Sequence, residues 1–327
     1  GLRVAGIPVT GDDTGETAAD TAVAVPVFGI DQLRLVDSRI SVYLGEHKPL
    51  TVHLDAIELQ NFLFDADAPP SPMSFVARVG EGRIELTGTL SADLHRQQLE
   101  AKLAVTDLQL QEFTRFGGVG ITSFAGVLDL DYRLQFSRAA GEPLAVGGEL
   151  DLRVQDVAYA EAGMSLELQA LSWQGQQALS ASAGASELTT QGRIELVAPD
   201  VSLPRFRFTA DHAAWEGSLE GALAEEGVRG EQQGTLDIAQ LQASLAFGVL
   251  AVEGVTADAR TYLGRDDPVV VNSAVLSGLT YDDREAGRRL LGIQASEIKA
   301  MQIDLARRGV DIEAIVLNGL DAMLNIT

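Results

Sequence analysis

The chain has 327 residues, a formal net charge of −23 and no cysteine. A chain this acidic, with no basic stripe along it, would be repelled by the phosphate backbone of nucleic acid, so no nucleic-acid partner is expected. The absence of cysteine excludes disulfides, thiolate metal sites and a cysteine nucleophile. Hydrophobic residues make up 46% of the chain, which is enough for a sizeable core and excludes wholesale disorder.

Residues 1–27 are expected to form an N-terminal segment of mixed character that contains an acidic linker, Gly11–Thr21. No stretch of about twenty uncharged apolar residues follows, so the sequence predicts no membrane-spanning helix. The chain opens at Gly1 without a signal-peptide pattern, and we interpret it as a piece of a longer protein. A contact with a membrane would then be made through segments missing from this chain.

From residue 28 onward, apolar and polar residues alternate along most of the chain. Over 128–136 the even-numbered residues are apolar, whereas the odd-numbered ones are Asp, Asp, Arg and Gln. Successive side chains of a strand point to opposite faces, so this period predicts strands with one apolar and one wet face. The predicted strands are 28–44, 50–64, 73–79, 82–94, 99–110, 124–136, 144–158, 164–173, 192–203, 205–210, 215–223, 234–247, 249–263, 269–281, 290–305 and 310–326.

A glycine followed by alternating apolar residues recurs along the chain, as in GRIELTGTL (82–90), GVLDLDYRL (126–134) and GRIELVAPDV (192–201). The intervals are irregular, which favours stacked strand pairs of variable loop length over a strict solenoid. Two stretches leave alternatives open. Residues 175–191 could form a short helix, an edge strand or a loop, and residues 284–291 a brief helix or a charged hairpin tip.

Residues that could carry catalysis or hold a metal are scattered. The four histidines, His47, His53, His95 and His212, have no metal-ligand spacing, and Gly117–Gly120 lacks the lysine of a phosphate loop. The acidic pairs Asp12–Asp13, Asp266–Asp267 and Asp282–Asp283 fit no calcium-loop pattern and are explained by solvated turns. We therefore expect no enzymatic activity, no cofactor and no metal site.

Five stretches, in this order, resemble the AsmA-like superfamily, especially its large bacterial envelope members of unassigned function. They are FGIDQLRLVDSRISV (28–42), PLTVHLDAIELQNF (49–62), the run of apolar residues and glycines from Phe75 to Leu90, LAVTDLQLQEFTRF (103–116) and ITSFAGVLDLDYRLQF (121–136). The resemblance divides the chain into the N-terminal segment 1–27, an AsmA-like β region 28–160, and a β-rich continuation of the same sheet, 161–327.

The resemblance implies an all-β fold, in which an elongated and mostly antiparallel sheet of irregular strand repeats is curled lengthwise into a taco-like groove. It further implies a periplasmic location, a tether to the inner membrane, other envelope proteins as partners, and a role in phospholipid transport or outer-membrane assembly. Inward-facing Leu, Val and Ile could solvate the acyl chains of phospholipids, because each buried methylene contributes about 0.8 kcal/mol. The candidate groove residues are Leu86, Leu90, Leu128, Leu130, Leu134 and Phe136.

Two other classes of function remain open at this point. One is a structural or adhesive β-rich envelope protein with a closed, dry core. The other is a glycan-active enzyme, which would need two carboxylates facing one cleft.

Overall fold

The structure, a computed structural model, describes residues 28–323 except 44–49, 66, 94, 117–120, 162, 183–184, 225–226, 264–268, 285–286 and 305–308. The described residues are almost entirely β-strand, which confirms the predicted all-β fold. The strands are β1 (Gly29–Val42), β2 (Leu50–Leu63), β3 (Ser71–Val79), β4 (Gly82–Ala92), β5 (Arg96–Gln109), β6 (Ile121–Ala139), β7 (Leu144–Glu161), β8 (Met164–Ser182), β9 (Ala185–Val197), β10 (Asp200–Leu203), β11 (Phe206–Thr209), β12 (His212–Ala224), β13 (Gly227–Ser244), β14 (Gly248–Leu263), β15 (Val269–Asp283), β16 (Arg288–Asp304) and β17 (Gly309–Ala322).

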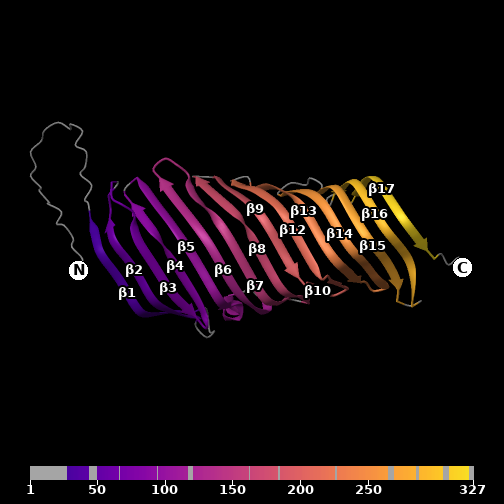
Figure 1. Cartoon of the computed structure of the whole chain (residues 1–327), viewed down its shortest axis with the longest axis horizontal. Helices are drawn as coiled ribbons and strands as arrows, with labels where there is room; N and C mark the ends of the chain where they lie inside the picture. The colour runs from indigo at the N-terminus through magenta and orange to yellow at the C-terminus, as the bar shows by residue number, and fades with distance from the viewer. Residues whose placement is uncertain are drawn as a thin grey trace, which may run out of the picture.

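All strands belong to one sheet, and every strand pairing in it is antiparallel. Strands β1 to β9 pair in chain order, β9 pairs with β12, and β12 to β17 again pair in order. Figure 1 shows the consequence: the strands lie side by side, with β1 at one end of the long axis and β17 at the other. Among the described residues β1 pairs only with β2 and β17 only with β16, so both are edge strands.

The pairings of six strands form a closed ring, β8–β9–β12–β13–β11–β10, and the other eleven strands lie outside it. In this respect the pairing differs from the simple curled sheet that the sequence predicts. The registers give the reason. Strands β9 and β10 pair with successive parts of β8, and β11 and β12 pair with successive parts of β13. The pairs β9–β10 and β11–β12 therefore each act as one interrupted strand, and the ring surrounds the two interruptions. Pro199, which has no N–H for the ladder, lies at the first interruption.

Several predicted strand boundaries differ from the structure, for example 234–247, which the structure gives as β13 (Gly227–Ser244), and three stretches bear on the fold. Residues 192–203, predicted as one strand, are divided between β9 and β10 by the break at Pro199. Of the stretch 175–191, the described residues 175–182 and 185–191 belong to β8 and β9, which settles them as strand. Residues Leu110–Phe116 form a 3-10 helix, η1, at the end of β5, where the sequence pattern indicates no helix.

Rows of paired residues trace the two faces of the sheet, because paired residues of an antiparallel ladder share a face. One row runs unbroken from Ser38 on β1 to Ile315 on β17, and the adjacent row on the same face runs from Leu35 to Ile312. Most residues in both rows are apolar or glycine. At these two levels the sheet therefore has one apolar face that extends across its whole length, whereas the next row on the same face, that of Leu134, continues into Gln177, Thr190, Gln232 and Thr261.

Four glycines on adjacent strands, Gly175, Gly192, Gly217 and Gly234, form part of the row from Leu35 to Ile312. A Cβ on Gly217 would lie 2.1 Å from the carbonyl oxygen of Gln233 on the neighbouring strand. Only glycine permits so close an approach of two backbones. Because the missing Cβ would project from the apolar face, the neighbouring strand is inclined toward that face, and the sheet bends with its apolar side inward.

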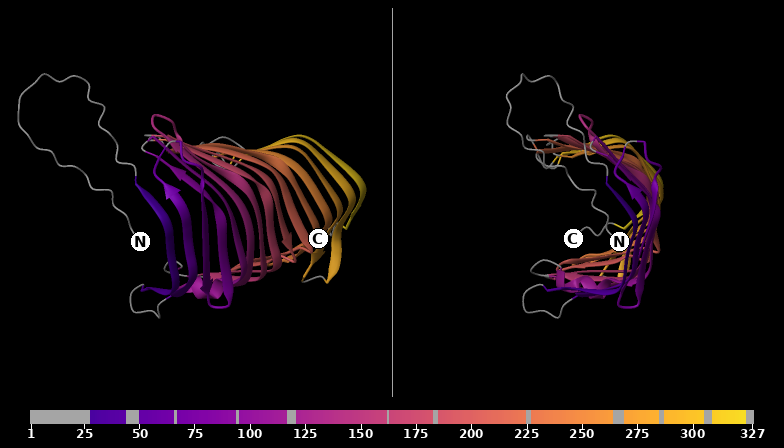
Figure 2. Two further views of the ribbon diagram at one scale, coloured as in Figure 1. Left: turned by 60° about the vertical axis from the view of Figure 1, so that its left-hand side comes forward. Right: turned by 90° about the vertical axis from the view of Figure 1, so that its left-hand side faces the viewer.

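A second line of irregular backbone crosses the sheet at another level. Asp156, Ala198, Gln240, Gly278 and Gly319 lie on alternate strands, and their φ angles of 49–65° are in the left-handed region. Each of these residues comes two positions after a residue of the apolar face, and the preceding residues all belong to one row. An extra residue in a strand bends it and increases its twist. The end view in Figure 2 shows the result, a sheet with a C-shaped profile.

Candidate functional site: the apolar face

The apolar face is built from rows of side chains that run across the strands. At the level of Leu130, the row is Ser38, Leu54, Ala77, Ile84, Val105, Leu130, Leu152, Trp173, Ile194, Trp215, Leu236, Ala257, Ala274, Ile298 and Ile315. Ser38 at one edge is the only polar residue in it. We call this surface, with the parallel rows on the same side, the apolar face.

The six predicted groove residues all lie on the apolar face and all are partly buried. Leu130 pairs with Val105 and Leu152, and Leu128 pairs with Leu108 and Val154. The other four lie in the next three rows along the strands. Leu86 is in the first of these rows, Leu134 is in the second, and Leu90 and Phe136 are together in the third. The structure thus places these side chains together on neighbouring strands of one surface.

The cover of this face is incomplete within the part of the chain that the structure describes. Its one cluster of buried core residues, Leu50, Val79, Val105 and Leu108, lies near η1, where Phe113 packs against it. No large side chain among the described residues is less than 2% exposed. On the edge strands the face is open, with Leu33 of β1 48% exposed and Ile315 of β17 53% exposed. Apart from the contact with η1, the apolar side chains of this sheet are covered only by their neighbours on the same sheet, so the cover is partial.

The two tryptophans of the chain cover the glycines at the bend. Trp173 lies beside Gly192, and Trp215 lies beside Gly217 and Gly234, with indole atoms 2.7–3.0 Å from the positions that a Cβ would take. Aromatic rings over strand glycines restore packing that the missing side chains cannot supply. The indole Nε1 of Trp173 is buried without a hydrogen-bond partner, which fits an environment that is apolar on this side of the sheet.

The opposite face is polar and is cross-linked by ion pairs between adjacent strands. Arg34 contacts Glu58 at 2.9 Å, Lys102 contacts Asp131 at 2.8 Å, and Arg260 contacts Glu231 at 2.6 Å. These side chains are exposed, so each pair contributes little to stability and mainly fixes the register.

One ion pair on this face also shifts a pKa. Arg78 contacts Asp55 at 2.6 Å, and its hydrogen bonds to the carboxylate lower the pKa of Asp55 below the usual range. The carboxylate therefore stays charged at a pH lower than that of an ordinary aspartate.

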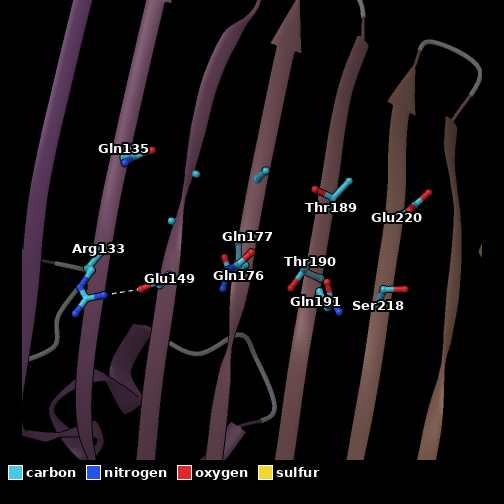
Figure 3. A pocket seen from close by; sticks show the side chains of 13 residues that line it. Arg133, Gln135, Glu149, Gln176, Gln177, Thr189, Thr190, Gln191, Ser218 and Glu220 are labelled. Atoms are coloured by element: carbon cyan, nitrogen blue, oxygen red, sulfur yellow. Dashed lines mark hydrogen bonds and ion pairs between the residues drawn. The ribbon is translucent and has the colours of Figure 1, made fainter.

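A shallow hollow of about 600 Å³ lies on this polar side, across β6 to β9 and β12. Figure 3 shows its lining, in which Arg133 reaches Glu149 at 2.7 Å and glutamine, threonine and serine side chains fill most of the remainder. Gly147, which has no side chain, and Ala178, which has only a methyl group, leave the hollow between longer neighbours. It holds no aromatic ring on which a ligand could stack.

The described part of the chain contains no cluster of side chains that could hold a metal ion. No group of three or more His, Asp or Glu side chains converges there, and none of its helices could span a membrane. His53, His95 and His212 lie on β2, before β5 and on β12, far apart in the order of strands. Asp282 contacts Arg289 at 3.4 Å, whereas Asp12–Asp13, Asp266–Asp267, His47 and Gly117–Gly120 lie outside the described residues.

Period-two alternation does not predict the line of left-handed residues Asp156, Ala198, Gln240, Gly278 and Gly319. Its sequence signal is an apolar residue, any residue, then Asp, Gln or Gly, then another apolar residue. This pattern occurs as VQDV (154–157), IAQL (238–241), LSGL (276–279) and LNGL (317–320). The two apolar residues are three positions apart yet lie on one face, because the left-handed residue between them shifts the alternation by one.

Comparison of the chain with protein-family models, with curated proteins and with solved structures gave no match.

Proposed function

We propose that the chain is a non-enzymatic, periplasmic β-groove module of an AsmA-like envelope protein, and that its apolar face holds the acyl chains of phospholipids. The proposal rests on one observation above all: a continuous apolar face that crosses the whole sheet and is only partly covered by the described residues. The C-shaped profile, with the apolar side inward at the glycine bend, would make this face an open groove.

The chemistry of the face fits a hydrocarbon ligand better than a polar one. Leu, Val, Ile and Phe supply area without hydrogen-bond donors, and acyl chains need nothing else. At about 0.8 kcal/mol per methylene, a chain of sixteen carbons gains roughly 10 kcal/mol from full transfer out of water, and half-burial still leaves several. Phospholipid movement or outer-membrane assembly is the role that the family resemblance suggests for such a groove.

A structural protein with a closed, dry core is the competing reading. A closed core would enclose large side chains almost completely, as close-packed interiors do. Among the described residues none of the large side chains reaches that state, and Leu179 and Leu188 on the apolar face are 37% and 38% exposed. These exposures favour the open groove.

The test adds the same charge to the two faces of one strand. Leu134→Glu places a carboxylate on the apolar face of β6, whereas Gln135→Glu places one on the polar face, a single residue away. A carboxylate without a partner is costly to desolvate, so Leu134→Glu should lower the amount of co-purified phospholipid several-fold, and Gln135→Glu should leave it unchanged. Lipid is measured by solvent extraction and mass spectrometry, and folding by circular dichroism and melting temperature.

Equal lipid content in the two variants would refute the groove. So would a parent protein that carries no phospholipid and takes up none from vesicles, while Leu134→Glu unfolds it. That second result would favour the closed structural alternative.

A further inference from the structure

We infer that copies of this chain associate end to end, with β17 of one copy pairing in parallel with β1 of the next and extending the sheet. The inference concerns the two edges of the sheet and does not depend on what the apolar face binds. It rests on the match between these edges in direction, level, exposure and charge.

The two edges run in the same direction. Because β9–β10 and β11–β12 each act as one interrupted strand, the sheet is a continuous antiparallel meander from β1 to β17. The chain reverses an even number of times between them, so β1 and β17 are parallel. Each has 14 residues, and on each the outer row of N–H and C=O groups has no strand partner among the described residues. A second copy placed by translation along the sheet would therefore present β1 in parallel to β17.

The rows of side chains reach both edges at matching levels. Leu35 and Ile312 end one row, and Ser38 and Ile315 end the next. The spacing of three residues between them is the same on both strands. If β1 of a second copy continued these rows beside β17, the apolar face would pass from one copy to the next without a step.

Many apolar side chains of the two edge strands are about half exposed. Leu33, Leu35 and Ile40 of β1 are 44–49% exposed, and Ile315 and Leu320 of β17 are 53% and 58% exposed. Edge strands of soluble proteins usually carry lysine or proline that discourages pairing, and neither β1 nor β17 contains either residue. Gly319 adds a bulge to β17, but the same bulge occurs in β13 and β15, which pair on both sides.

The charges of the two edges are complementary on the polar face. The row that begins at Arg34 on β1 ends at Asp311 on β17. Strand β17 carries Asp311, Glu313 and Asp321 and no basic residue, whereas β1 carries Arg34 and Arg39 together with Asp31 and Asp37, so the complementarity is confined to the level of Arg34. Pairing β17 with β1 would place Asp311 beside Arg34, which already contacts Glu58 of its own copy, and would give that guanidinium a second carboxylate. Pairing β17 with another β17 would bring acidic side chains together.

The absence of cysteine makes the contact directly testable by disulfide cross-linking. Ser38→Cys and Ile315→Cys are prepared as separate proteins, mixed and oxidised. Adjacent strands bring level residues within the distance that a disulfide spans. The mixture should give a covalent dimer several-fold more abundant than either variant alone. A mixture of Ser38→Cys with Leu320→Cys, which is off level, should give little.

The parent protein should also show a mass that rises with concentration in sedimentation or light-scattering measurements, because a head-to-tail contact does not close. Asp311→Arg should reduce this association, and circular dichroism would show that the variant keeps its fold. A parent protein that stays monomeric at every concentration would overturn the inference. So would a dimer that forms equally well from Ile315→Cys or Ser38→Cys alone, because it would mean that like edges pair with each other.

Discussion

The bend of the sheet should depend on the absence of a single Cβ at Gly217. In Gly217→Ala the new methyl group would lie 2.1 Å from the carbonyl oxygen of Gln233 and 2.7 Å from Cα of Gly234. Both are backbone atoms, so neither can move without shifting a strand. Overpacking of this kind costs about 1–3 kcal/mol of the free energy of unfolding. For a chain of this size that corresponds to a fall in melting temperature of roughly 1.5–4 °C.

Gly221 provides the matched control, because it lies on the same strand and the same face, four residues further along. A Cβ there would meet no atom closer than 3.8 Å, the carbonyl oxygen of Arg229. Neither Gly217 nor Gly221 has a left-handed φ, so alanine adds no backbone strain at either position. Gly221→Ala should therefore keep the stability of the parent or raise it by up to about 1 kcal/mol.

The assay is thermal and urea unfolding of both variants, followed by circular dichroism. If Gly217→Ala melts at the same temperature as Gly221→Ala, then the close approach of the strands does not constrain the fold, and the reasoning about the bend is refuted. If both variants lose stability equally, strand glycines matter here for a reason other than the bend.

Two further predictions concern charge and backbone strain. Asp55→Asn should lower the melting temperature at pH 7. The difference from the parent should shrink as the pH falls below about 3.9, the pKa of an unfolded aspartate, because a lowered pKa in the folded state contributes stability that is lost as the carboxylate becomes protonated. A difference independent of pH would contradict this role for the pair with Arg78. Ala198→Gly should raise the free energy of unfolding by up to about 1 kcal/mol, since Ala198 has a φ of 49° that glycine adopts without a steric cost. Its control, Ala213→Gly in regular strand, should lower that free energy, and chemical denaturation of both would show whether the sign differs as expected.

The strands could be predicted from the sequence because one face of the sheet is apolar and the other is exposed to water, so the side chains alternate along each strand. Leu128 to Phe136 alternates without a break, and the structure gives β6 through all of it. The interruption at Pro199 was not predicted, although the residue that causes it is visible. Alternation shows which side of a strand is apolar, but it does not show where the hydrogen bonding between strands is interrupted.

That the candidate groove residues share one face could be predicted for the same reason. The six groove candidates share the apolar face, but so do many residues that alternation marks equally well, among them Trp173 and Trp215. The curvature of the sheet was beyond pattern reading. The glycines at 175, 192, 217 and 234 are far apart in sequence, and only the register of three strand pairings places them in one row.

That same row changes character along the sheet, and the change bears on what the apolar face can hold. From β4 to β7 its residues are Leu86, Leu103, Tyr132 and Leu150, and from β8 to β13 they are the four glycines. Large side chains fill the inside of the bend in the first part, whereas in the second part the backbone itself forms the inner surface beneath two indole rings. A groove with this lining would be shallower near β4 and deeper near β12. An acyl chain lying across the strands would therefore be buried most where the glycines are, whereas the charge of Leu134→Glu, on β6 beside Tyr132, would meet the chain in the shallower part.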